Sequence, residues 1–178
     1  MTRFDPPALL TAAHDASAFD SGEPVLDDWL RQRALANLLL AASRTYVVCP
    51  AGTKRIAGYF ALSMGQILAT ETPGSMRRNM PRHIPAVVLG RLAIDRDFQG
   101  SGLGRALLHD AIRRAQIAAA EVSARLVLVH ALSPAAEAFY LHHGFVKLPV
   151  EGMVLGLDLM KLGPVSGSMN PDTFFMKL

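Results

Sequence analysis

The chain has 178 residues, of which 51% are apolar and 19% charged, with a formal net charge of +3 and a pI near 9.4. This length is typical of one domain that buries its own core, and no apolar run reaches the roughly 18 residues that a membrane span needs. The first residues lack the apolar centre of a secretion signal, and the one cysteine, Cys49, cannot form an internal disulfide. We therefore expect a cytoplasmic protein without a membrane segment, in which Cys49 is a small core residue.

The first quarter of the sequence predicts a strand, a helix and a β-hairpin. Residues 8–14 can open a strand, and the leucines of residues 25–40 have helical spacing. Residues 44–49 and 56–64 have the composition of strands, and a proline- and glycine-containing turn links them.

The middle of the sequence predicts a long connection, a strand, a glycine turn and a long helix. Residues 65–85 show no periodicity and contain three prolines, which is typical of a functional or mobile loop. Residues 86–94 are apolar and β-branched, and residues 103–120 carry an apolar stripe with helical spacing. Between them, the turn at residues 99–104 reads Gln-Gly-Ser-Gly-Leu-Gly.

The last third predicts a strand, a short helix and a closing hairpin. Residues 125–131 are strand-like, and Ser133 followed by proline is a favourable helix start, with Gly144 as its end. Residues 145–148 and 153–160 would complete the sheet.

The glycine turn between a strand and a helix is a candidate anion site. Main-chain N–H groups at a helix N-terminus and the helix dipole favour phosphate, and glycine lets the backbone approach it closely. The turn is not a P-loop, because Arg105-Ala106 follows in place of Lys-Ser or Lys-Thr. Its G-x-G-x-G spacing also differs from the dinucleotide-binding fingerprint. A turn without a ligand is the alternative.

Two motifs and the order of the elements carry a family resemblance. Residues 92–104 read Leu-Ala-Ile-Asp-x-x-x-Gln-Gly-x-Gly-x-Gly, and residues 138–145 read Ala-Phe-Tyr-x-x-x-Gly-Phe. Over roughly residues 8–160 the chain resembles the GNAT family of N-acetyltransferases. The resemblance implies an α/β fold, α+β in some schemes, whose mixed sheet of about seven strands is splayed at its middle and flanked by about four helices. Residues 1–162 would form this single domain, and residues 163–178 a tail of unknown role.

The resemblance also implies a site for acetyl-coenzyme A as the acetyl donor, and no metal. The N–H groups of residues 100–104 would hold the pyrophosphate, and the edge of residues 92–94 would pair with the pantetheine arm like an added strand. Ser133 stands where the family often has asparagine. The implied donor-binding residues are Leu92, Ala93, Ile94, Gln99, Gly100, Ser101, Gly102, Leu103, Gly104, Arg105 and Ser133.

Tyr140 is the catalytic residue that the resemblance implies. The family has a tyrosine on this helix beside the coenzyme sulfur, and a phenol with an ordinary pKa near ~10 can protonate or hydrogen-bond the leaving thiolate. An N–H of residues 92–94 would stabilise the oxyanion. The alternative is that Tyr140 only packs beside Phe139 and Phe145.

Four further segments resemble the GNAT toxins of bacterial toxin–antitoxin pairs: residues 20–30, 42–48, 77–81 and 89–93. Those toxins acetylate the α-amine of aminoacyl-tRNA, which stops translation, and a ribbon-helix-helix antitoxin of the DUF1778 type holds them inactive. The resemblance therefore implies a type II toxin with aminoacyl-tRNA as acceptor, that antitoxin as partner, and a homodimer.

Clustered arginines fit a tRNA acceptor, because a guanidinium binds two phosphate oxygens at once. The expected tRNA-binding residues are Arg77, Arg78, Arg82, Arg91, Arg31, Arg33 and Arg44. They would bind the backbone without reading its sequence. For any one cluster, a solvated face is the alternative.

The sequence also bears on the proton acceptor. An α-amine, with a pKa near ~7.7–8.0, is far more often neutral than a lysine side chain and needs less help from a base. Residues 86–94 contain no carboxylate, and Asp95 and Asp97 come only after them. Water is therefore the expected proton acceptor, with His130 as the alternative base and a hydrogen-bonded strand histidine as its structural interpretation.

Two other functions remain open at this point. One is a GNAT enzyme that acetylates a small-molecule amine or a protein N-terminus, although the 15 acidic residues form no cluster that would attract a polyamine. The other is a catalytically silent binding module, against which the intact residues 99–104 and Tyr140 argue.

Overall fold

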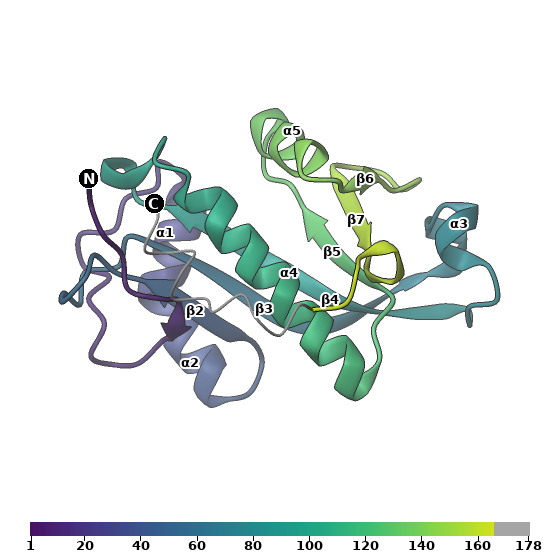
Figure 1. The fold of residues 1–178 in the computed structure, drawn as a ribbon, viewed down its shortest axis with the longest axis horizontal. Helices are drawn as coiled ribbons and strands as arrows, with labels where there is room; N and C mark the ends of the chain where they lie inside the picture. Colours follow the sequence, from purple (N-terminus) through teal and green to yellow (C-terminus); the bar gives the residue numbers. More distant parts are fainter. Residues whose placement is uncertain (166–178) are drawn as a thin grey trace. The chain divides into compact units, whose positions relative to one another are not determined.

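The computed structural model describes residues 1–165, and the predicted tail at 163–178 lies almost wholly outside the described residues (Figure 1). The strands are β1 (Ala8–Leu9), β2 (Arg44–Val48), β3 (Gly58–Leu68), β4 (His83–Ile94), β5 (Leu126–His130), β6 (Val146–Lys147) and β7 (Val154–Asp158). The α-helices are α1 (Pro24–Gln32), α2 (Ala34–Leu39), α3 (Gly74–Arg77), α4 (Leu103–Val122) and α5 (Pro134–His142). Three short 3₁₀ helices follow β3, β4 and β7: η1 (Ala69–Glu71), η2 (Arg96–Phe98) and η3 (Leu159–Lys161).

The strands form one mixed seven-stranded sheet in the order β1-β2-β3-β4-β5-β7-β6. β4 pairs with β5 in parallel, whereas β1–β2, β2–β3, β5–β7 and β6–β7 are antiparallel. The predicted fold class and strand number are confirmed. The residues described hold five α-helices rather than about four, because Arg33 interrupts the first predicted helix and α3 was not expected.

Two compact units share these elements and are taken in turn. Unit 1 contains residues 1–62 and 91–111, and unit 2 contains residues 63–90 and 112–165. The grouping of residues 1–162 into a single domain stays a prediction.

In unit 1, the apolar faces of α1 and α2 belong to the same core as β2 and β3. Trp29 of α1 stacks on Tyr59 of β3 with ring centres 6.0 Å apart, and the Tyr59 hydroxyl donates a hydrogen bond to the carbonyl of Leu26 at 2.7 Å. Arg33, with φ of −124°, separates α1 from α2. The predicted helix at residues 25–40 is therefore present, but in two pieces.

In unit 2, short elements replace much of the predicted loop at residues 65–85. β3 continues to Leu68, α3 follows, and β4 begins at His83. Met76 of α3 is only 3% exposed and belongs to the same core as Ile84 and Leu126. α3 has only four residues, too few to show a periodicity, and it packs into the core through Met76.

The rest of unit 2 follows the sequence more closely. β5 pairs with β4 from Ala86↔Leu126 to Leu89↔Val129, and β7 and β6 extend this part of the sheet beside α5 (Figure 1). Gly65 makes close packing possible, because a Cβ there would lie 2.7 Å from Val88 Cγ2.

Candidate functional site

The glycine turn of unit 1 has the open geometry that an anion site needs. Gly100 and Gly102 have φ angles of 74° and 86°, in the left-handed region that favours glycine. A Cβ on Gly100 would meet no atom within 4 Å, so the space above the turn is open. α4 begins at Leu103, and the first N–H groups of a helix have no partner within it. Free N–H groups and an open approach together fit a pyrophosphate.

The turn starts from a tightly packed strand end. A Cβ on Gly58 of β3 would lie 2.8 Å from Cδ1 of Ile94 and 2.9 Å from Cδ1 of Leu107 of α4, so with any other residue these side chains would have to shift. Leu103 and Leu107 are completely buried on the same side of α4. The last residues of β4 are thereby fixed against β3 and α4.

The other predicted donor-binding residues of unit 1 differ in exposure and in hydrogen bonding. Leu92 and Ile94 are half-buried, Ala93 is buried, and Arg105 is exposed on the first turn of α4. The Ser101 hydroxyl donates to the carbonyl of Phe98 at 2.6 Å. The Gln99 side-chain amide donates to the carbonyls of Ser21 and Ile94, each at 2.9 Å.

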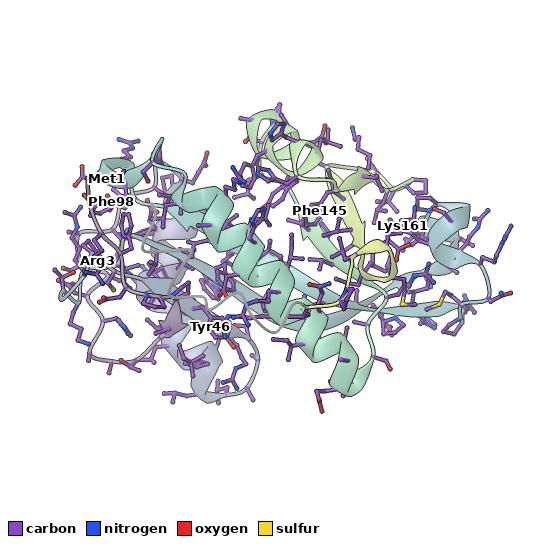
Figure 2. All side chains as sticks on the ribbon, in the orientation of Figure 1. Met1, Arg3, Tyr46, Phe98, Phe145 and Lys161 are labelled. Carbon is purple, nitrogen blue, oxygen red and sulfur yellow. The ribbon has the colours of Figure 1, made fainter. Side chains whose placement is uncertain are left out.

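In unit 2, Tyr140 lies in an aromatic cluster. Its ring meets Phe139 and Phe145 edge to face, with centres 5.3 Å and 5.4 Å apart, and Phe145 is labelled in Figure 2. Tyr140 is 6% exposed, and burial raises the pKa of its phenol far above the ordinary value near ~10. Within residues 1–165 no hydrogen bond of its hydroxyl is found. The phenol therefore keeps its proton at neutral pH and has it available for donation.

Helix α5, which carries Tyr140, begins as the sequence predicts. The Ser133 side chain accepts a hydrogen bond from the N–H of Ala136 at 3.1 Å, and Pro134 occupies the first helical position. Gly144, with φ of 92°, follows the end of the helix. The Ser133 oxygen is thus engaged in capping, while its hydroxyl proton remains free to be donated.

Three of the predicted tRNA-binding arginines lie together in unit 2. Arg77 is the last residue of α3, Arg78 follows it, and Arg82 directly precedes β4. All three are exposed, and none has a carboxylate partner among the residues described. A phosphate could therefore bind them without displacing an ion pair.

The arginines of unit 1 are in more varied surroundings. Arg31 donates to the carbonyl of Phe19 at 2.6 Å and pairs with Asp28 at 3.0 Å, so it already has strong partners. Arg33 and Arg44 are exposed. The Arg91 guanidinium lies 4.1 Å from the centre of the Trp29 ring, and its burial lowers its pKa.

Two further candidate residues, His130 and Cys49, differ in their surroundings. His130, the last residue of β5, pairs with Val154 of β7 through its main chain, and its side chain is exposed, with no hydrogen-bond partner among the described residues. Cys49 is buried, and desolvation raises the pKa of its thiol to about 11, in agreement with a core residue. Residues 1–165 contain no group of three or more potential metal ligands and no helix able to cross a membrane.

Asp95 is the residue that the sequence analysis did not assign. It is 2% exposed and directly follows β4. Its carboxylate accepts hydrogen bonds from the N–H groups of Asp20 at 3.1 Å and Asp97 at 3.0 Å, and from Arg55 at 3.2 Å. The sequence feature that could have identified Asp95 is its position, because it is an acidic residue between an apolar strand and a glycine turn.

Comparison with known families agrees with this arrangement. The profile of the acetyltransferase (GNAT) domain matches residues 42–147, which is more than half of the chain. The chain belongs to the GNAT acetyltransferase family. A tRNA-acetylating toxin of Mycobacterium tuberculosis (strain ATCC 25618 / H37Rv) is 46% identical over 161 residues, which cover 90% of this chain and 95% of the relative.

Solved structures of the same family resemble the chain over nearly its full length. A tyrosine-to-phenylalanine mutant of KacT has a TM-score of 0.84 and 28% identity, and covers 89% of this chain and 96% of its own. AtaT in complex with acetyl-methionyl-tRNAfMet has a TM-score of 0.82 and 29% identity, with 88% and 95% covered. AtaTR bound with acetyl-CoA has a TM-score of 0.75 and 29% identity, with 89% and 94% covered.

Proposed function

We propose that this GNAT acetyltransferase is a tRNA-acetylating toxin, which transfers the acetyl group of acetyl-CoA to the α-amine of aminoacyl-tRNA and so blocks translation. The observation that carries the proposal is the 46% identity, over nearly the whole of both chains, with a tRNA-acetylating toxin. AtaT, known in complex with acetyl-methionyl-tRNAfMet, supports the acceptor, and AtaTR bound with acetyl-CoA supports the donor.

The chain's own residues supply donor binding at the glycine turn. The N–H groups at residues 100–104 would bind the pyrophosphate, and the open space at Gly100 leaves room for it. The edge of β4 at residues 92–94 would pair with the amides of the pantetheine arm. Ser101, Arg105 and Ser133 complete the proposed donor-binding set. When bound, acetyl-CoA supplies an activated thioester.

Tyr140 is the proposed general acid. Its phenol is protonated at neutral pH, burial raises its pKa further, and within residues 1–165 its hydroxyl is without a hydrogen-bond partner. Such a phenol can give a proton or a hydrogen bond to the thiolate that leaves the donor. An N–H group of residues 92–94 would stabilise the negative charge that develops on the acetyl oxygen.

The acceptor requires a neutral amine and a positively charged surface. An α-amine is neutral in a large fraction of molecules near pH 8, so water can take its proton. The strongest candidates for binding tRNA phosphates are Arg77, Arg78 and Arg82, because they are exposed and form no ion pair with a carboxylate among the described residues. Arg91, Arg33 and Arg44 of unit 1 are further candidates, whereas Arg31 would first have to leave Asp28.

Further partners follow from the same relatives. AtaT has been solved with the C-terminus of the antitoxin AtaR, and both AtaT–AtaR and KacTA have been solved with DNA. We propose that an antitoxin of the ribbon-helix-helix type inhibits this chain, that the toxin is a homodimer, and that it acts in the cytoplasm, where charged tRNA is found.

The deciding experiment is acetyl transfer from radiolabelled acetyl-CoA with purified protein and several acceptors in parallel. We expect label in aminoacyl-tRNA, recovered as the N-acetyl amino acid after hydrolysis of the ester. Uncharged tRNA is the matched control, since it has the same phosphates but lacks the amine. Label only in a polyamine or in a peptide N-terminus would assign the enzyme to another acceptor, and no transfer would favour a silent binding module.

A further inference from the structure

The residues that hold the glycine turn reach back to the segment that starts α1. The side chain of Asp95 accepts the N–H of Asp20 at 3.1 Å, and the N–H of Arg96 donates to the carbonyl of Asp20 at 2.8 Å. The Gln99 amide donates to the carbonyl of Ser21 at 2.9 Å. Three hydrogen bonds thus join residues 20–21 to residues 95–99, which lead into the turn. Residues 20–22 (loop 20–22) and residues 95–99 together form a junction.

Glycine at position 22 is part of the same junction. It has a φ of 91°, and a Cβ there would lie 3.1 Å from both Nε and Nη2 of Arg96. Arg96 also forms an ion pair with Asp20 at 3.5 Å. An alanine at position 22 would therefore strain the main chain, and the Arg96 side chain would have to shift by a few tenths of an ångström.

Loop 20–22 is in turn fixed to α1. The N–H and the hydroxyl of Ser21 both donate to the buried carboxylate of Asp27, at 3.0 Å and 2.6 Å. On the other side of the junction, Arg55 binds both Asp95 and Asp97, and its guanidinium lies 5.1 Å from the centre of the Phe98 ring. The junction is thus supported from both sides within unit 1.

The hydrogen bonds of Gln99 limit what this residue can do for a coenzyme. Both neighbours of its side-chain amide are carbonyl oxygens, Ser21 and Ile94, so the nitrogen must face them and both of its hydrogens are used. The remaining amide oxygen is an acceptor, which an anionic phosphate does not bind. The side chain of Gln99 can therefore serve the donor site by holding the main chain of the turn, and not by donating to a phosphate.

We propose that Asp95 and Gln99 are positioning residues, which fix the coenzyme-binding turn to loop 20–22 and so set the affinity for acetyl-CoA. Neither side chain touches the coenzyme in this assignment. The role rests on the proposed function only for the identity of the donor, since the acceptor amine plays no part in it. It also explains physically why Asp20, Ser21 and Gly22 precede α1.

The test is the dissociation constant of coenzyme A, measured by calorimetry on the purified full chain without any acceptor. We expect Asp95→Asn to weaken binding about tenfold, because its amide group faces donors that the carboxylate accepted, and Gln99→Met to weaken it about threefold. In acetyl transfer, the same variants should raise KM for acetyl-CoA and leave kcat at saturation unchanged, a split that general destabilisation would not produce.

Asp97→Asn is the matched control. Asp97 binds the same Arg55, but its side chain is exposed and makes no contact with loop 20–22, so binding should be weakened much less than in Asp95→Asn. Gly22→Ala changes the junction in loop 20–22, at a residue with no proposed role in donor binding. This variant should also weaken the binding of coenzyme A. Gly52 has a similar φ of 75°, but a Cβ there would meet nothing within 4 Å, so Gly52→Ala should leave the binding of coenzyme A unchanged.

The outcomes separate this inference from the function on which it rests. Wild-type affinity in both Asp95→Asn and Gln99→Met, or an equal loss in Asp97→Asn, would overturn the positioning role while leaving the acetyltransferase intact. Failure of the wild type to bind coenzyme A would overturn the proposed donor and this inference together. If Asp95→Asn does not fold, as followed by fluorescence of the single tryptophan Trp29, the exposed Gln99→Met decides alone.

Discussion

The two units hold their proposed functional groups in different surroundings. In unit 1 the glycine turn offers main-chain N–H groups, and a polar junction around the buried carboxylate of Asp95 holds it in place. In unit 2 the Tyr140 hydroxyl has no hydrogen-bond partner among the described residues, and an aromatic cluster surrounds its ring. An anion-binding turn needs a fixed backbone, whereas a proton donor needs a free and desolvated side chain. Substitutions in the turn of unit 1 should therefore change the binding of the donor, whereas substitution of Tyr140 in unit 2 should change turnover.

Tyr140→Phe should have the largest effect. Removing the phenol proton leaves the thiolate without its acid, and we expect kcat to fall about 100-fold. KM for acetyl-CoA and the affinity for coenzyme A should stay close to the wild type, because the turn of unit 1 is untouched. Steady-state kinetics and calorimetry measure the two quantities.

Tyr59→Phe is the matched control for Tyr140→Phe. The Tyr59 hydroxyl bonds the carbonyl of Leu26 inside the core of unit 1, so its loss should lower the free energy of unfolding by about 1 kcal/mol. Turnover should persist. Comparable loss of kcat in both variants would show that Tyr140 acts through stability rather than through its proton.

Neutralising Arg77 and Arg78 together should have the next largest effect. These exposed arginines of unit 2 are proposed to bind phosphates, so we expect the double glutamine variant to raise KM for aminoacyl-tRNA about tenfold at low salt. The slope of log(kcat/KM) against log salt should fall by about two, one for each lost contact. An equal removal of charge at Arg3 and Lys54, both exposed in unit 1, is the control and should leave the slope unchanged.

Gly100→Ala should weaken the binding of acetyl-CoA without changing kcat. Alanine at a φ of 74° strains the turn by about 1–2 kcal/mol, and its Cβ enters the open space assigned to the pyrophosphate. We expect KM for acetyl-CoA to rise about fivefold, with kcat unchanged. Gly52→Ala, with the same kind of φ and equally open surroundings, should cost similar stability without moving KM. A fall in kcat with unchanged KM would break the division between the units.

The sequence was sufficient for features that a local pattern encodes. The glycine turn, the cap at Ser133 and most of the succession of strands and helices along the chain follow from residue types at fixed spacing, and the structure contains them. Helix α3 could not be predicted, because it has only four residues and Met76 is buried against residues that are distant in the sequence, such as Leu126. The junction at Asp95 was missed for the same reason, since its partners Asp20 and Arg55 lie 75 and 40 residues away in the sequence.

His130→Ala should have the smallest effect, and it tests whether unit 2 supplies a base as well as an acid. The rate should rise with pH as the α-amine, with a pKa near ~8 or lower, becomes neutral, and then level off. Because burial raises the pKa of Tyr140 above its ordinary range, the phenol stays protonated and no alkaline fall should begin near pH ~10. The side chain of His130 is exposed and has no hydrogen-bond partner among the described residues, so the profile of kcat/KM from pH ~6 to ~10 should be the same in His130→Ala. A profile that loses or shifts its rising limb in this variant would make His130 the proton acceptor. Unit 2 would then carry the whole proton transfer, and water would have no part in it.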